Sequence, residues 1–176
     1  MKRRFEWLAK LINDNQYTLG AEVGVATGIT TDYLLNHCPT LKKLITVDMW
    51  YPVDSPKWNR PDMEQVFRGL FGENDRVRII KSISWEGAKF VTPQSLDFVF
   101  IDASHEFTLV LKDVKSWIKT LKIDGILCGH DYHNIGVRTM LDYVFGDKYK
   151  LAGVDNCWYV EMKDITNYFL HQLTKK

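Results

Sequence analysis

The segment Thr18-Leu-Gly-Ala-Glu22-Val-Gly24-Val-Ala-Thr-Gly28-Ile29 decides the fold of this chain. Its small and apolar residues from Leu19 to Val25 predict a buried strand, and residues 29–37 predict a helix. Glycine at positions 24 and 28 allows a sharp turn between them and lets a ligand approach the backbone closely. A strand that turns directly into a helix points the free N–H groups of the helix into the bend. We therefore predict a ligand-binding loop at the end of a parallel strand.

An acidic residue, Asp48, ends the next predicted strand, which covers residues 44–47. Such an acid beside a glycine loop is typical of a nucleotide-type pocket at the edge of a parallel sheet. A dinucleotide loop needs the pattern G-x-G-x-x-G, but this loop has two glycines, with Ala26 between them. Glu22 would repel a pyrophosphate and suits a cationic group such as an amine. The loop therefore favours an adenosine-type ligand that carries an ammonium group.

The bulk properties predict one domain over residues 1–176, which begins with an amphipathic helix within residues 1–14. Because Lys+Arg total 23 and Asp+Glu total 22, nothing in the charge predicts nucleic acid or an anionic membrane as a partner. Glu6 and Lys10 interrupt the first apolar run, so we expect no signal peptide, no membrane span and a cytoplasmic location. The three cysteines are far apart and predict neither a disulfide framework nor a zinc site.

Hydrophobic periodicity predicts strands that alternate with helices, which is the pattern of a doubly wound, mostly parallel α/β sheet with helices on both faces. We expect helices at 3–13, 30–37, 62–71, 107–121, 137–145 and 164–173, and a further one that begins within residues 82–88, with Ser82 or Ser84 as its N-cap. We expect seven strands, at 19–25, 44–47, 77–80, 96–101, 126–129, 148–152 and 157–162. Asp124-Gly125 is expected to form a turn before the fifth strand, and the last two strands an antiparallel C-terminal edge hairpin. The loop 49–61 is either a connector with aromatics on the core or a lid.

The run Glu22-Val-Gly24-Val-Ala-Thr-Gly28 resembles the first motif of the class I S-adenosylmethionine (SAM)-dependent methyltransferases. Asp48 is similar in position to the residue that holds the ribose hydroxyls in that family. The segments Phe100-Ile-Asp-Ala-Ser-His-Glu106 and Gly129-His-Asp-Tyr132 resemble a branch of small-molecule O-methyltransferases. The resemblance covers nearly the whole chain after the first helix and implies a Rossmann-like sheet. It implies SAM as cofactor and O-methylation of a small hydroxylated molecule, such as a sugar or a natural-product phenol.

This resemblance implies a set of cofactor-binding residues at the carboxyl ends of the strands. In it, the end of the third strand meets the adenine. The set consists of Glu22, Gly24, Ala26, Thr27, Gly28, Asp48, Met49, Ser82, Ile83, Asp102 and Ala103.

Two carboxylates follow predicted strands: Asp102 ends the fourth strand and Asp131 follows the fifth. If those strands are neighbours, they lie about 4.8 Å apart, and both carboxylates could then reach one ion, with Asn134 or His133 completing the set. Oxygen ligands of this kind suit magnesium or calcium, and catechol-type O-methyltransferases have a metal site at similar positions. Tyr132 departs from that pattern. In the alternative, Asp102 caps a helix or contacts the cofactor, and Asp131 pairs with a loop group.

His105 follows the fourth strand and His130 the fifth, so both face the same predicted cleft. A histidine titrates near neutral pH and can take the proton of an acceptor hydroxyl, and we assign His105 as the base. The predicted catalytic residues are therefore His105, Asp102 and Asp131. Two other functions stay open: a nicotinamide-dependent oxidoreductase and a SAM-binding module without catalysis. The acceptor pocket is expected to come from the first helix, the 49–61 loop and a second copy in a homodimer.

Overall fold

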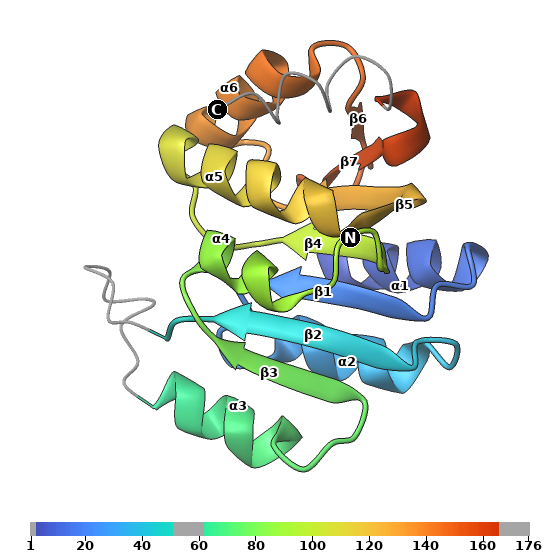
Figure 1. The fold of residues 1–176 in the computed structure, drawn as a ribbon, viewed down its shortest axis with the longest axis vertical. Coiled ribbons are helices and arrows are strands. Elements are labelled where there is room, and N and C mark those ends of the chain that lie inside the picture. The colour runs from blue at the N-terminus through green and yellow to red at the C-terminus, as the bar shows by residue number, and fades with distance from the viewer. Residues whose placement is uncertain (1–2, 51–61, 166–176) are drawn as a thin grey trace.

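The computed structural model describes residues 3–50 and 62–165. The helices are α1 (Arg4–Asp14), α2 (Ile29–His37), α3 (Met63–Phe71), α4 (Ser84–Gly87), α5 (Phe107–Trp117) and α6 (Ile135–Phe145). The strands are β1 (Leu19–Val23), β2 (Lys43–Asp48), β3 (Val77–Lys81), β4 (Leu96–Ile101), β5 (Leu121–Gly129), β6 (Lys150–Leu151) and β7 (Trp158–Glu161). Strand and helix alternate through most of the described chain, as the hydrophobic periodicity predicts (Figure 1).

These strands form one seven-stranded sheet in the order β3-β2-β1-β4-β5-β7-β6. Strands β1 to β5 pair in parallel, whereas β7 pairs antiparallel with both β5 and β6. The strand order reverses at β1 and β4, which places a crevice outside their carboxyl ends. The predicted fold, a doubly wound parallel sheet with an antiparallel C-terminal edge, is confirmed.

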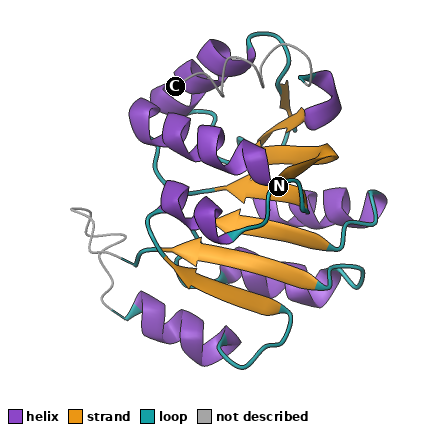
Figure 2. Cartoon of the chain, in the orientation of Figure 1, coloured by secondary structure: helices purple, strands orange, loops and turns teal. Residues whose placement is uncertain are grey.

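Helices cover both faces of the sheet, and each face has its own apolar core (Figure 2). Helices α1 and α2 pack on one face around Phe98 and Phe100 of β4. Helices α4, α5 and α6 pack on the other face around Val99 and Ile101. Successive residues of β4 thus serve opposite cores, which explains why the whole strand is apolar except for Asp97.

Asp124 and Gly125 do not form the turn that the sequence predicts, because they lie inside β5. The pairing of β4 with β5 moves from Leu96 opposite Leu121 to Phe98 opposite Ile126. The extra residues of β5 bulge out of the ladder, and Lys122 of the bulge pairs with Asp97 of β4 at 2.5 Å. Pairing with β4 therefore overrides the local turn signal.

The ends of the chain hold two further differences from the predictions. Strands β6 and β7 are shorter than the predicted 148–152 and 157–162. Residues 162–164 form a 3₁₀ turn, and the rest of the predicted helix 164–173 lies almost wholly outside the described residues. The lid prediction for 49–61 also lies outside them, apart from Met49 and Trp50. Across residues 3–50 and 62–165, no helix combines the length and the apolarity that crossing a membrane requires.

Candidate active site

The glycine loop after β1 is held in shape by Asp48 at the end of β2. Its Oδ2 accepts hydrogen bonds from the N–H groups of Val25 and Ala26, both at 2.9 Å. Its Oδ1 accepts a third from the N–H of Trp50 at 2.7 Å. Ala26 adopts a positive φ of 49°, which non-glycine residues rarely do. Asp48, which the resemblance assigns to the ribose, therefore also orders the loop that would surround the cofactor.

The same loop presses against the end of β4. Gly24 has a φ of +88°, and a Cβ at this position would lie 2.2 Å from the backbone oxygen of Asp102. Gly28 has a φ of +91° and precedes the first turn of α2. The predicted cofactor residues of β1 and those of β4, Asp102 and Ala103, are thus brought together by a backbone contact that only glycine allows.

Glu22 lies beneath this loop and is 2% exposed. The hydroxyl of Thr31 on α2 donates a hydrogen bond to its Oε2 at 2.6 Å. Burial raises the pKa of Glu22 to about 8. A largely protonated side chain that is already hydrogen-bonded supports the packing of α2 on β1. The role toward a cationic ligand group that we predict for Glu22 stays a prediction.

Two apolar side chains at the ends of β2 and β3 stay partly exposed. Met49 is 39% exposed and Ile83 is 37% exposed, although large apolar side chains usually pack away from water. Their strands are neighbours, with Asp48 opposite Lys81, and the N–H of Ser82 donates to the backbone oxygen of Asp48. The adenine contact that the resemblance implies for this end of β3 stays a prediction.

Trp50 belongs to this loop as well, and the sequence analysis does not assign it a site role. Its Nε1 donates a hydrogen bond to the backbone oxygen of Ala26 at 2.8 Å, and its ring centroid lies 5.4 Å from that of Phe67. Trp50 therefore joins the cofactor loop to α3. An aromatic residue two positions after the strand-ending acid is the signal that could have indicated it.

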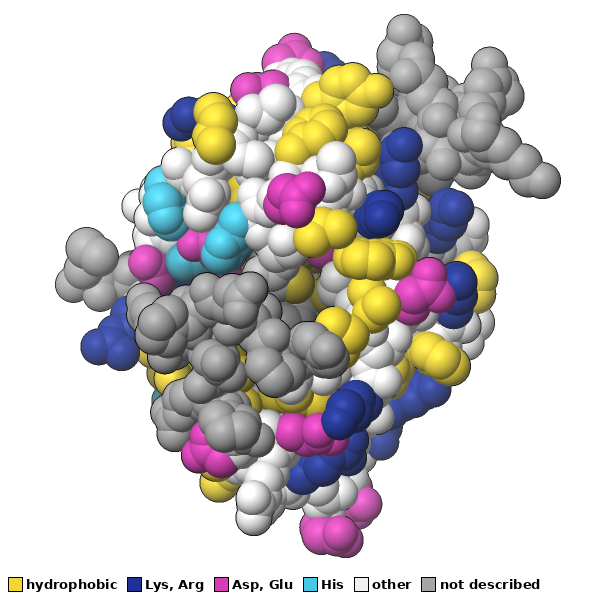
Figure 3. Space-filling view, turned by 90° about the vertical axis from the view of Figure 1, so that its left-hand side faces the viewer, with side chains coloured by type: hydrophobic (Ala, Val, Ile, Leu, Met, Phe, Trp, Pro, Cys, Tyr) yellow, Lys and Arg dark blue, Asp and Glu magenta, His cyan; other side chains and the backbone are white. Residues whose placement is uncertain are grey.

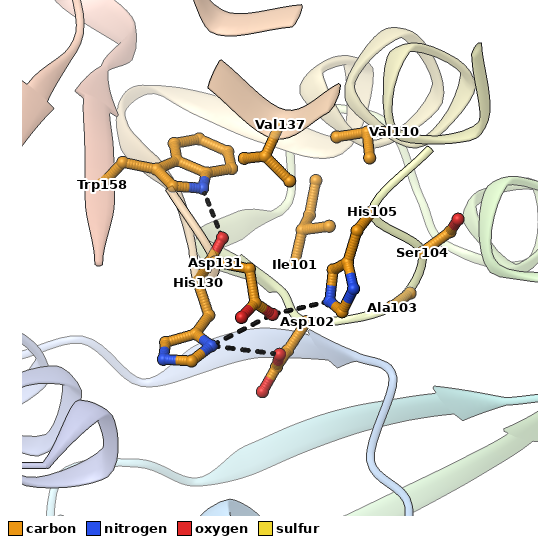
Figure 4. A pocket seen from close by; sticks show the side chains of 10 residues that line it. All are labelled: Ile101, Asp102, Ala103, Ser104, His105, Val110, His130, Asp131, Val137 and Trp158. Atoms are coloured by element: carbon orange, nitrogen blue, oxygen red, sulfur yellow. Dashed lines mark hydrogen bonds and ion pairs between the residues drawn. The ribbon is translucent and has the colours of Figure 1, made fainter. Parts of the chain in front are cut away.

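A second group of side chains gathers after β4 and β5 (Figure 4). Nε2 of His105 donates to Oδ2 of Asp131 at 2.6 Å, and Nδ1 of His130 donates to the same oxygen at 3.1 Å. Oδ1 of Asp102 lies 3.7 Å from Nδ1 of His130. Histidine and acidic side chains are seen together on this edge of the sheet in Figure 3. The structure thus brings together the three predicted catalytic residues, because Ile101 and Gly129 are paired at the ends of β4 and β5.

The charges of this group depend strongly on Asp131. Burial alone would raise the pKa of Asp131, but the hydrogen bonds from His105 and His130 outweigh it and hold that pKa far below its usual range. The bond to Asp131 raises the pKa of His105 above its ordinary value, although partial burial opposes this. Asp131 also has a φ of +61°, and strained backbone of this kind concentrates at functional sites. The side chain of His105 is 42% exposed, against 14% for that of Asp131, so the imidazole is the accessible member of the pair.

Two residues that are far apart in the sequence complete this group. Nε of Arg4, at the start of α1, lies 3.0 Å from Oδ2 of Asp102, and the backbone N–H of Arg4 donates to Asp155. Oδ1 of Asp155, in the β6–β7 turn, lies 3.8 Å from Nε2 of His130. The sequence analysis assigns neither Arg4 nor Asp155, because no local pattern marks a contact over 151 positions.

Asp102, His105 and Asp131 each offer one ligand atom, and these atoms lie within 4.8 Å of one another. Two carboxylates and one imidazole are a set that suits a transition metal better than Mg²⁺, which prefers oxygen ligands. Arg4 already neutralises one oxygen of Asp102. Asn134, the predicted third ligand, precedes α6, and its backbone N–H donates to the backbone oxygen of Asp131. The donor set therefore does not favour the predicted magnesium ion.

The comparisons with known proteins agree with the fold described above. Residues 21–132 match a family described as a methyltransferase domain. The methyltransferase PaMTH1 of Podospora anserina, solved with bound SAH, superposes with a TM-score of 0.68 at 17% identity, over 92% of this chain and 79% of that chain. A putative caffeoyl-CoA O-methyltransferase from Staphylococcus aureus gives a TM-score of 0.65 at 18% identity, over 92% and 84%. An O-methyltransferase from Bacillus cereus in complex with SAH gives 0.63 at 15% identity, over 90% and 80%. A comparison with curated proteins finds no match.

At identities this low, the superpositions show a shared fold and nothing more. The match over residues 21–132 spans the glycine loop and Asp48. It also spans the two strand ends that carry the acid–imidazole group, which consists of Asp102, His105, His130 and Asp131. The resemblance to class I SAM-dependent methyltransferases that the sequence analysis draws is confirmed.

Proposed function

Since this chain belongs to the methyltransferase domain family, we propose that it methylates a hydroxyl group of a small molecule, with SAM as the methyl donor. The observation that carries this proposal is the exposed His105, hydrogen-bonded to Asp131 beside the end of β4. The loop of β1 contacts that same strand end through Gly24. A proton acceptor and a cofactor loop therefore share one edge of the sheet, as a methyl transfer to oxygen requires.

Bound SAM would supply an electrophilic methyl group, and the chain's own residues would prepare the acceptor. His105 takes the proton of the acceptor hydroxyl, and Asp131 holds the ring and stabilises the imidazolium that forms. Asp131 stays ionised throughout, because its pKa lies far below the usual range. His130 and Arg4 fix the carboxylates of Asp131 and Asp102 from the other side. These contacts preorganise the group before an acceptor arrives.

A metal-assisted version of this reaction would use Asp102, His105 and Asp131 as ligands, and a bound ion would lower the pKa of the acceptor hydroxyl. Magnesium is the metal that the sequence analysis predicts, and it stays a prediction. Since His105 is a ligand in one version and the base in the other, the two versions exclude each other at this residue.

The acceptor side of the site is proposed to include α1. The structure supports this role for the leading helix, because Arg4 contacts Asp102 beside the acid–imidazole group. We also propose that the chain forms a homodimer, lies in the cytoplasm and has no nucleic-acid partner.

Calorimetry with SAM, its demethylated product SAH and NAD tests the cofactor. We expect SAM and SAH to bind and NAD to give no response; micromolar NAD binding without a SAM response would establish the oxidoreductase alternative instead.

Methyl transfer from labelled SAM to a panel of catechols and sugars then tests the reaction. His105→Ala should lose turnover, whereas His37→Ala, at an exposed histidine on α2, should keep it. Binding of SAH with no transfer to any acceptor, and equal residual turnover in both variants, would favour the non-catalytic module.

A further inference from the structure

Helix α5 carries two fully buried side chains, Asp113 and Trp117, that lie one turn apart on the same side of the helix. Nε1 of Trp117 donates a hydrogen bond to the backbone oxygen of Ser84 at 2.9 Å. The Ser84 hydroxyl is also the one polar group among the described residues that lowers the pKa of the Asp113 carboxyl. Trp117 is therefore bonded to the first residue of α4, and Asp113 is buried one turn before it on α5.

Helix α4 is only four residues long and follows Ser82 and Ile83, the residues assigned to the adenine end of the cofactor. A helix this short has little stability of its own, so its position depends on its neighbours. It is wedged between the sheet and α5, because a Cβ at Gly87 would lie 2.6 Å from Cγ1 of Val47 and 3.3 Å from Cζ2 of Trp117. A shift of α4 would move Ser82 and Ile83 with it.

We propose that Trp117 is a positioning residue for cofactor binding, which fixes Ser84 and thereby places Ser82 and Ile83. We further propose that the buried carboxyl of Asp113, which has no hydrogen-bond partner among the described residues, allows α4 to keep this position only while it carries no charge. This inference rests on the proposed function, because it needs a cofactor at the ends of β2 and β3. It assigns a role to a buried acid that the methyl-transfer mechanism does not use.

The surroundings of Asp113 support the neutral form. Neither carboxylate oxygen makes a hydrogen bond of normal geometry to a described residue. Burial raises the pKa of Asp113 to about 7, and the Ser84 hydroxyl offsets this rise only in part. The charged side chains on α5 and on the elements packed against it leave that pKa unchanged; they are Glu86, Lys89, Lys112, Lys115, Lys119, Arg138 and Asp142.

Ionisation of Asp113 would create a buried charge without a partner, which is strongly unfavourable. The chain can relieve it by moving α4 away, at the expense of the adenine surface. The affinity for the cofactor is therefore highest below about pH 7 and falls as the pH rises through that value.

Calorimetric titration of the full chain with SAH, at about pH 6 and about pH 8.5, tests this inference. We expect the wild type to lose roughly fivefold or more in affinity at the higher pH. Asp113→Asn is permanently neutral and should remove this loss, while whatever pH dependence the site histidines contribute remains in the variant. Asp142→Asn, at an exposed acid on α6, is the matched control and should behave as wild type. An equal pH dependence in wild type and Asp113→Asn would overturn the inference.

Two further variants keep the test decisive if Asp113→Asn does not fold. Ser84→Ala removes the hydroxyl that lowers the pKa of Asp113, so the loss of affinity should begin at a higher pH. Trp117→Phe keeps most of the packing but loses the N–H donor, and should weaken SAH binding roughly threefold to tenfold at both pH values. An unchanged pH midpoint in Ser84→Ala, or unchanged affinity in Trp117→Phe, counts against the inference. A wild-type chain that binds SAH at neither pH would refute the proposed function instead.

Discussion

Replacing Gly24 with alanine should destabilise the chain and weaken cofactor binding, because Gly24 is where the cofactor loop meets β4. Its φ of +88° is unfavourable for an L-residue, which costs about 1–2 kcal/mol. The new Cβ would also lie 2.2 Å from O of Asp102, 2.6 Å from its C and 2.8 Å from Cα of Ala103. All three are backbone atoms, so no side-chain rotation relieves the overlap, and such overpacking costs about a further 1–3 kcal/mol. The free energy of unfolding should therefore fall by about 2–5 kcal/mol.

Urea denaturation measures this loss, and Gly146→Ala is the matched control. Gly146 also has a positive φ, of 55°, but a Cβ there would meet no atom within 4 Å. The control therefore carries only the backbone cost, and the difference between the two variants reports the collision. SAH affinity should fall in Gly24→Ala and stay unchanged in Gly146→Ala. If both variants lose the same stability within about 0.5 kcal/mol, the close approach that we infer between the loop and Asp102 is wrong.

Three further predictions concern the acidic and imidazole side chains of the site. Asp48→Ala removes the acceptor of three loop N–H groups and should weaken SAH binding at least about tenfold, and by more than it weakens folding; calorimetry that shows a change within about twofold would contradict this. His105→Ala should lower turnover about 10²- to 10⁴-fold. Wild-type turnover should fall as the pH drops through the raised pKa of His105, because the protonated imidazole cannot accept a proton. Turnover that survives a chelator supports His105 as the base, and turnover that is lost supports the metal-assisted version. The folded chain depresses the pKa of Asp131, so the ionised side chain contributes to folding stability above about pH 4, and this contribution is lost as the pH falls below that value. Thermal unfolding should therefore show that the stability difference between wild type and Asp131→Asn shrinks below about pH 4.

Most of the fold could be predicted because its signals are local. Most of the parallel strands are short, mainly apolar runs that end at a polar or glycine residue or directly before one, and the helices follow with their own period. The prediction fails at β5, where Asp124 and Gly125 have the composition of a turn. Pairing with the preceding strand, β4, decides the conformation of that segment, since Leu121 and Ile126 both pair with it. No pattern within the segment itself records that pairing.

The candidate site divides in the same way. Asp102, His105 and Asp131 could be placed together because each follows the end of a strand, and those strand ends are neighbours in the sheet. The surroundings of Asp48 could not, since its three N–H donors come from two loops whose shapes depend on positive φ values at Ala26 and Trp50. Burial also decides details that composition cannot, such as the hydrogen bond that Thr31 of α2 donates to the buried Glu22.

Arg4 connects the predicted site residue Asp102 with a part of the chain that the sequence motifs do not include. Its backbone N–H is fixed by Asp155 near the end of the described chain, and its guanidinium faces Asp102 at the centre of the sheet edge. The guanidinium of Arg4 therefore lies against Asp102, a carboxylate that a metal ion would need as a ligand. The contact between α1 and the β6–β7 turn helps to hold Arg4 in this position. The packing of α1 against the β6–β7 turn therefore decides whether Arg4 reaches Asp102. Contacts between distant segments leave no mark in the sequence motifs, which include Asp102 but not Arg4, and this is why the motifs leave the mechanism open. The assignment of His105 as the base stays a prediction.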